Sequence, residues 1–234
     1  MIGFYNYTVI LTYVSLIISS IGICFAGAGK PYLAIFCLIL SGVCDMFDGK
    51  IARTRKHSTA AEKRFGIQID SLCDLVCFGV LPAVIGIQLA TPDPELVAAM
   101  PYIDSMFEVS RIRSLIVLGY AAWVLGALLV LCALIRLAYF NVTEEMRQDT
   151  VGGRRTSFEG LPVTSAAIIF PFAFIVSRLC PALLSAWVYP VFMLVTAVCF
   201  ITPFKVSKPH KKGLIVMSAI GLAEIAGLIY LMVR

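Results

Sequence analysis

Four aspartates stand at spacings that could build a metal site. Asp45 and Asp48 are three residues apart, and Asp70 and Asp74 are four residues apart. On an α-helix, either spacing places both side chains on one face. Each pair lies where an apolar run meets a polar stretch, so two neighbouring antiparallel helices would gather all four carboxylates at one edge of an apolar layer.

Four close carboxylates repel one another unless a counter-charge neutralises them. Oxygen ligands select hard cations, so we expect Mg²⁺, Mn²⁺ or Ca²⁺ rather than zinc or copper. Two such ions held by shared aspartates suit phosphoryl transfer, because they stabilise the attacking and the leaving oxygen. The alternative is a set of solvated helix ends paired with Lys50, Arg53 and Lys63, which would explain one aspartate more readily than four.

Small residues and an arginine surround the aspartates. Gly49 directly follows the second aspartate, and Gly66 lies one turn before the third. Ala52 and Arg53 lie about one turn after the second. Small residues let a bulky ligand approach the backbone, and a guanidinium binds phosphate oxygens in bidentate fashion. Glycines also allow close packing of membrane helices, and both explanations can hold.

The composition indicates which elements must position these residues. Of the 234 residues, 60% are apolar and 14% are charged, against about 45–50% and about 25% in soluble domains. A soluble fold of this size cannot bury so much apolar surface. The composition therefore predicts a membrane domain, and it argues against a disordered chain and a nucleic-acid-binding module.

Seven apolar runs approach the length of about 20 helical residues that a bilayer core requires. They predict an all-α, polytopic integral membrane helical bundle. The runs are roughly Thr8–Gly27, Pro31–Phe47, Ile67–Thr91, Ser114–Phe140, Leu161–Leu179, Pro181–Thr202 and Gly213–Val233.

The loops between these runs predict the orientation. If the sides alternate from the amino terminus, 14 of the 19 basic residues fall on the side of that terminus. Cytoplasmic loops carry the excess of Lys and Arg, so this side is expected to be the cytoplasm. All four aspartates then lie at the cytoplasmic face of the cytoplasmic membrane.

The pattern formed by these residues resembles the signature of the CDP-alcohol phosphatidyltransferase family. It reads Asp45-x2-Asp48-Gly49-x2-Ala52-Arg53-x12-Gly66-x3-Asp70-x3-Asp74, with a longer gap after the arginine than is usual in the family. Further strings resemble the phosphatidylserine synthase branch, namely Phe65–Asp74, Phe78–Pro82, Arg136–Asn141, Phe158–Pro162 and Phe204–Lys212. The resemblance implies a six-helix core within residues 1–212, with residues 213–234 as an additional C-terminal transmembrane helix.

The resemblance also implies a reaction: transfer of the phosphatidyl group from CDP-diacylglycerol to L-serine, with release of CMP. Two Mg²⁺ or Mn²⁺ ions are expected, bridged by Asp45 and Asp70. Asp48 would complete the first ion site and Asp74 the second. Asp74 would also act as general base on the incoming hydroxyl, and a homodimer in the lipid bilayer is expected.

Other residues receive expected roles in substrate binding. Gly49, Ala52, Arg53 and Gly66 would contact the CDP-lipid. Thr12 and Ser15 would line the nucleotide region, or would bond back to their own helix. Arg136 and Asn141 would bind the acceptor; alternatively Arg136 is a positive-inside anchor and Asn141 a helix cap.

Two alternatives to serine transfer stay open at this point. The same chemistry with glycerol 3-phosphate or inositol phosphate would need several cations for the acceptor phosphate, and Arg154 and Arg155 could supply them. A membrane cation transporter would use the aspartates as an ion site. Such sites usually lie near the bilayer midplane at broken helices, whereas these carboxylates are expected at helix ends.

Overall fold

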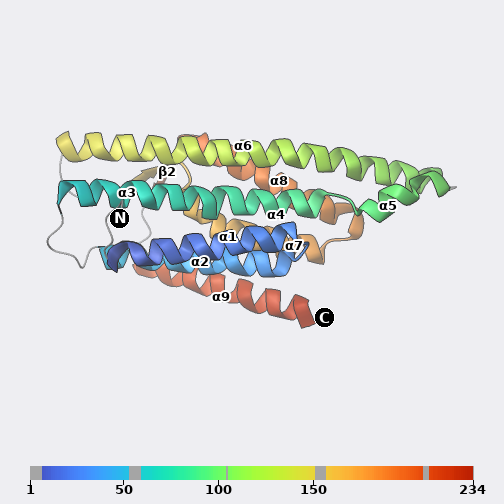
Figure 1. The fold of residues 1–234 in the computed structure, drawn as a ribbon, viewed down its shortest axis with the longest axis horizontal. Coiled ribbons are helices and arrows are strands. Elements are labelled where there is room, and N and C mark those ends of the chain that lie inside the picture. The colour runs from blue at the N-terminus through green and yellow to red at the C-terminus, as the bar shows by residue number, and fades with distance from the viewer. Residues whose placement is uncertain (1–6, 53–58, 104, 151–156, 208–210, 234) are drawn as a thin grey trace.

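The computed structural model describes residues 7–52, 59–103, 105–150, 157–207 and 211–233. Its long helices run roughly side by side (Figure 1). The first two are α1 (Ile10–Gly27) and α2 (Pro31–Ala52). Next, α3 (Ala60–Asp74) and α4 (Leu81–Ala90) follow one another in line, joined by a π-helical segment at Leu75–Val80.

The second half of the chain adds α5 (Pro94–Ala99), α6 (Met106–Thr150), α7 (Ala166–Leu179), α8 (Ala182–Ile201) and α9 (Lys211–Val233). Three 3₁₀ turns occur at Tyr7–Val9, Met100–Tyr102 and Val163–Ser165. Helices α2, α6 and α8 end, and α1, α3, α7 and α9 begin, at one end of the bundle, on the left in Figure 1. We call this the α2–α3 end.

The apolar helices confirm the predicted all-α, polytopic membrane fold. Five helical stretches among the described residues are long and apolar enough to cross a bilayer: Ile10–Gly27, Pro31–Asp48, Ala60–Tyr102, Met106–Arg147 and Leu184–Ile201. Val163–Leu179 and Ser218–Val233 form shorter apolar stretches. Large apolar side chains such as Ile17, Val124 and Leu194 are exposed on the outside of the bundle, as lipid contact requires.

Two helices extend well beyond the apolar runs that predicted them. Helix α3 begins at Ala60, seven residues before the run, and a capping box fixes its start. There the Glu62 amide donates to Thr59 Oγ1 (3.2 Å), and the Thr59 amide donates to Glu62 Oε2 (2.9 Å). Helix α6 has 45 residues, about 68 Å at 1.5 Å per residue. Because the hydrocarbon core is only about 30 Å thick, polar residues extend the helix past it.

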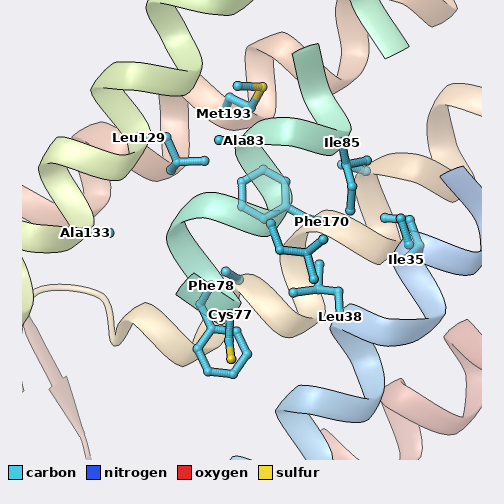
Figure 2. Close-up of a cluster of buried hydrophobic side chains, with 14 of the residues drawn as sticks. Ile35, Leu38, Cys77, Phe78, Ala83, Ile85, Leu129, Ala133, Phe170 and Met193 are labelled. Carbon is cyan, nitrogen blue, oxygen red and sulfur yellow. The ribbon is translucent and has the colours of Figure 1, made fainter. Parts of the chain in front are cut away.

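The core lies where α2, α4, α6, α7 and α8 meet. Figure 2 shows Ile35 and Leu38 from α2 beside Phe78, Ile85 and Phe170. These side chains have no solvent-exposed surface. Their packing fixes the positions of α2 and of the continuous helix formed by α3, the π-helical segment and α4. These helices carry the four aspartates.

A short two-stranded ribbon joins two connections at the α2–α3 end. Strands β1 (Ser157–Glu159) and β2 (Lys205–Ser207) pair antiparallel, with Phe158 opposite Val206. After β1 the chain turns at Gly160, whose φ of 75° is the left-handed conformation that favours glycine. The ribbon was not predicted, because three-residue strands leave too short a pattern to recognise.

Candidate metal and acceptor site

Three carboxylates converge at the α2–α3 end of the bundle. Asp45 comes from α2, and Asp70 and Asp74 come from α3. One oxygen of each lies within 4.8 Å of the others, and all three residues are partly buried. The helical spacings thus do what the sequence predicts: each puts its aspartates on the face that meets the other helix.

Asp48 lies beside this trio and is buried. Thr12, which is buried on α1, donates a long hydrogen bond from Oγ1 to Asp48 Oδ2 (3.5 Å). The carboxyl group of Asp48 also interacts with that of Asp70. The cluster therefore draws on three helices, with Thr12 positioning one of its members.

The chemistry of this cluster fits a hard divalent cation. Its donors are carboxylate oxygens, which suit Mg²⁺ or Mn²⁺ better than softer metals. Ion pairs among the described residues include Arg64 with Glu145, Arg111 with Glu108 and Arg147 with Glu144. None of these pairs neutralises Asp45, Asp70 or Asp74. Close carboxylates need a counter-charge, and a bound cation would supply it.

A cavity of about 170 Å³ adjoins the cluster and is lined by both Asp74 and Arg136. Pro162, Val163 and Thr164, which directly precede α7, line it as well. Arg136 is only 6% exposed. It donates from Nε to the Leu161 carbonyl (3.2 Å), and its guanidinium lies 5.7 Å from the centre of the Phe140 ring. A buried cation and an acid thus face one small space.

The left-handed turn at Gly160 supports the position of Arg136. A Cβ built on Gly160 would come within 3.1 Å of the Thr202 carbonyl oxygen and within 3.4 Å of Arg136 Nε. The turn therefore lets the chain pass close to Arg136 and present the Leu161 carbonyl to it.

Asn141 is held by Ser71, a residue that the sequence motifs do not indicate. Its Nδ2 donates to Ser71 Oγ (2.9 Å), and Ser71 Oγ lies 3.2 Å from Asn141 Oδ1. Ser71 directly follows Asp70, so this contact ties α6 to the helix that carries two of the carboxylates. Asn141 does not cap a helix, because α6 continues to Thr150. The signal for Ser71 is weak, since a single serine next to an aspartate does not by itself indicate a partner 70 residues away.

The remaining predicted site residues lie on α1, α2 and α3 or outside the described residues. Gly49 and Ala52 lie in the last turn of α2, and Arg53 lies outside the described residues. Gly66 lies within α3, and a Cβ there would meet nothing within 4 Å, so this surface is open to a ligand. Ser15 is buried, and its hydroxyl contacts the Ser41 carbonyl (3.4 Å) and Cys77 Sγ (3.5 Å) rather than an aspartate.

The comparison with known sequences agrees with this geometry. The sequence model of the CDP-alcohol phosphatidyltransferase family matches residues 5–203, most of the chain. The chain therefore belongs to that family.

Several curated relatives within this family are similar to the chain. A CDP-diacylglycerol–serine O-phosphatidyltransferase of Saccharomyces cerevisiae is 33% identical over 159 residues, which cover 66% of this chain and 47% of that protein. A Helicobacter pylori protein of the same name is 27% identical over 165 residues, which cover 70% of this chain and 55% of that protein. An archaetidylserine synthase of Methanothermobacter thermautotrophicus is 31% identical over 140 residues, covering 60% and 45% of the two chains. The chain spans about half the length of the curated relatives it matches.

Proposed function

We propose that this protein transfers the phosphatidyl group of CDP-diacylglycerol to L-serine and releases CMP. The observation that carries the proposal is the cavity shared by Asp74 and Arg136, directly beside the carboxylate cluster. Family membership supports the reaction class, and the names of the relatives support serine as the acceptor.

Asp45, Asp48, Asp70 and Asp74 would hold two divalent ions, Mg²⁺ or Mn²⁺. When bound, these ions would supply charge neutralisation to the donor's diphosphate and to the departing CMP. Thr12 holds the Asp48 carboxylate in place through its hydroxyl.

Asp74 would act as the general base, since it lines the cavity in which an acceptor would sit. The serine hydroxyl oxygen forms a bond to the phosphorus that carries diacylglycerol. The bond from that phosphorus to the bridging oxygen breaks, CMP leaves with the electron pair, and the hydroxyl proton passes to Asp74. Positioned proton transfer of this kind typically contributes about 10²–10⁴-fold to the rate.

Arg136 would bind the carboxylate of serine, because it is the cation that lines the same cavity as Asp74. Asn141 would contribute from the next turn of α6, oriented by Ser71. Gly49, Ala52, Arg53 and Gly66 would contact the CDP-lipid, with Thr12 and Ser15 on the nucleotide side.

The cellular setting completes the proposal. Residues 1–212 would form the transferase domain, and residues 213–234 an additional transmembrane helix. The site would face the cytoplasm from the cytoplasmic membrane, because serine and CMP are water-soluble and the basic loops gather on that side. The functional unit would be a homodimer.

The deciding experiment is CMP release by the purified protein in detergent, with CDP-diacylglycerol and Mn²⁺ or Mg²⁺. Serine, inositol, inositol phosphate and glycerol 3-phosphate are compared, with Asp74→Asn as control. Release that needs serine and is lost in the variant would support the proposal. Release with glycerol 3-phosphate or inositol phosphate instead would reject serine. No release with any acceptor would contradict the transferase reaction, because a transporter or a scaffold would release no CMP.

Arg136→Ala tests the acceptor assignment within the same assay. A hydrogen-bonded charge pair is worth about 1.5–3 kcal/mol, so we expect the KM for serine to rise about 10- to 150-fold. The KM for CDP-diacylglycerol should change little, and Arg136→Lys should recover part of the loss. Equal increases in both KM values would contradict the assignment.

A further inference from the structure

Next to the carboxylates on α3 lies a pair of cysteines whose sulfur atoms are in contact. Cys73 is the residue before Asp74 in α3, and Cys77 lies in the π-helical segment that follows. Their Sγ atoms are 3.5 Å apart, and the two residues are 4% and 0% exposed. Figure 2 shows Cys77 beside Phe78 in the core.

The two thiols lie against a polar strip on α1. Cys73 Sγ donates to the Thr12 carbonyl (3.2 Å), and Cys77 Sγ donates to the Ser15 carbonyl (3.7 Å). Ser19 and Ser41, whose hydroxyl oxygens are 2.7 Å apart, continue the strip between α1 and α2. The mechanism proposed above uses neither of the cysteines.

The sulfur separation matches a pair of ligands on one soft centre. With metal–sulfur bonds of about 2.3 Å, two sulfur ligands of a tetrahedral ion lie about 3.8 Å apart. The observed 3.5 Å is close to this value, so both sulfurs can reach one atom with little movement. Sulfur prefers soft centres and carboxylate oxygen prefers hard ones, so this pair would select a different ion from the neighbouring aspartates.

From this geometry we propose that Cys73 and Cys77 form a second site, which binds one thiophilic metal or metalloid centre and thereby disables the carboxylate cluster. Binding removes both thiol protons, so the hydrogen bonds to the Thr12 and Ser15 carbonyls are lost. Thr12 also holds Asp48, and Cys73 is covalently joined to Asp74. A change at the sulfurs is thus passed to two of the four carboxylates.

The π-helical segment makes such a change possible. It begins at Leu75, between the two cysteines. A π-helical turn departs from the regular hydrogen-bonding ladder, and such turns often occur at functional sites. A small shift of Cys77 relative to Cys73 therefore does not require a regular α-helix to break.

Phenylarsine oxide is the probe for this site. Its trivalent arsenic forms two As–S bonds, the As–O bond breaks, and the oxygen leaves as water with the two thiol protons, without any change of oxidation state. Intact mass of the folded, full-length protein in detergent should show one adduct, reversed by a dithiol but not by a monothiol. The adduct should be lost in Cys73→Ser and in Cys77→Ser.

Cys37→Ser and Cys132→Ser are matched controls, because each removes a buried cysteine outside the pair. Both should keep the adduct. An adduct that forms only after denaturation, or that persists in both Cys73→Ser and Cys77→Ser, would overturn the site.

The effect on the carboxylates has a readout that does not depend on transferase activity. We expect Mn²⁺ to raise the Tm of the untreated protein, and the adduct to remove at least half of that rise in the wild type but not in Cys77→Ser. An adduct that leaves the Mn²⁺ effect intact would overturn the inhibitory role. The inhibitory role rests on the proposed function, but Mn²⁺ binding and adduct mass can be measured even if serine proves to be the wrong acceptor.

Discussion

Among the described residues, the buried acids are Asp48, at the α2–α3 end, and Glu224, in α9, and the two regions differ in their surroundings. At the α2–α3 end, Asp45, Asp70 and Asp74 converge beside a cavity and a buried arginine. In α9, Glu224 is 5% exposed, and neither of its carboxylate oxygens has a hydrogen-bond partner among the described residues. Around it, Leu228 is buried and Gly227 packs against Ile175, so its setting is apolar.

The comparison shows that burial alone does not define a site. Ionisable residues inside a membrane helix are costly and by default suggest function, which would mark both regions equally. Only the aspartates converge from separate helices, carry a positioning hydroxyl and face a space large enough for a ligand. Glu224 is buried, and the described residues around it provide none of these features.

The largest expected difference between the regions is in catalysis. Asp70→Asn should lower the rate of CMP release at least about 100-fold, because metal ions contribute several kcal/mol to such reactions. Glu224→Gln makes the same chemical change in a buried acid and should keep activity within about twofold. A large loss of CMP release in Glu224→Gln would show that both regions contribute to catalysis and would contradict this prediction.

The second largest expected difference between the two regions is in metal binding. Mn²⁺ at about 100 times its Kd should stabilise the folded protein by about 2.7 kcal/mol. For a chain of this size that corresponds to a Tm rise of about 5–10 °C. Thermal unfolding in detergent should show this rise for the wild type and for Glu224→Gln, and a much smaller one for Asp45→Asn. An equal rise in Asp45→Asn would place the ion elsewhere.

A smaller effect is expected where α6 meets the carboxylate helix. Ser71→Ala removes the partner of Asn141, and a neutral hydrogen bond contributes about 0.5–1.5 kcal/mol. We expect the kcat/KM for serine to fall about two- to tenfold, while Ser71→Thr, which keeps the hydroxyl, should lie closer to the wild type. A wild-type value in Ser71→Ala would show that the Ser71–Asn141 contact does not position the acceptor.

The last expected difference concerns stability rather than activity, at Glu224. Glu224→Met replaces an acid that has no partner with an apolar chain of similar length, which should relieve a burial cost of about 1–3 kcal/mol. The Tm should rise by about 2–4 °C for each kcal/mol relieved. A fall in Tm instead would reveal that the carboxyl group has a stabilising partner.

The sequence predicted the features that depend on local spacing. Helical periodicity placed the aspartates on facing sides of α2 and α3, and apolar runs located the helices. The polar ends of α3 and α6 were not predicted, because they lie beyond the apolar signal and depend on caps such as Thr59–Glu62. Contacts between distant residues were also missed, including Ser71–Asn141 and the contact of Ser15 with Cys77. Such pairs depend on helix packing, which local patterns do not encode.

The ribbon at the α2–α3 end has a consequence for how the molecule can move. Gly160 donates its amide to the Phe204 carbonyl (2.7 Å), and Leu161 donates to that of Cys199 (3.3 Å). Together with the β1–β2 pairing, these bonds fasten the start of the α7 segment to the end of α8. The two segments must therefore shift as a single body, or unfold locally at the cost of several backbone bonds. Any fast change in the width of the cavity that Asp74 and Arg136 line then falls to the other two helices on its wall, α3 and α6, so ligand entry and exit depend on the motion of these helices.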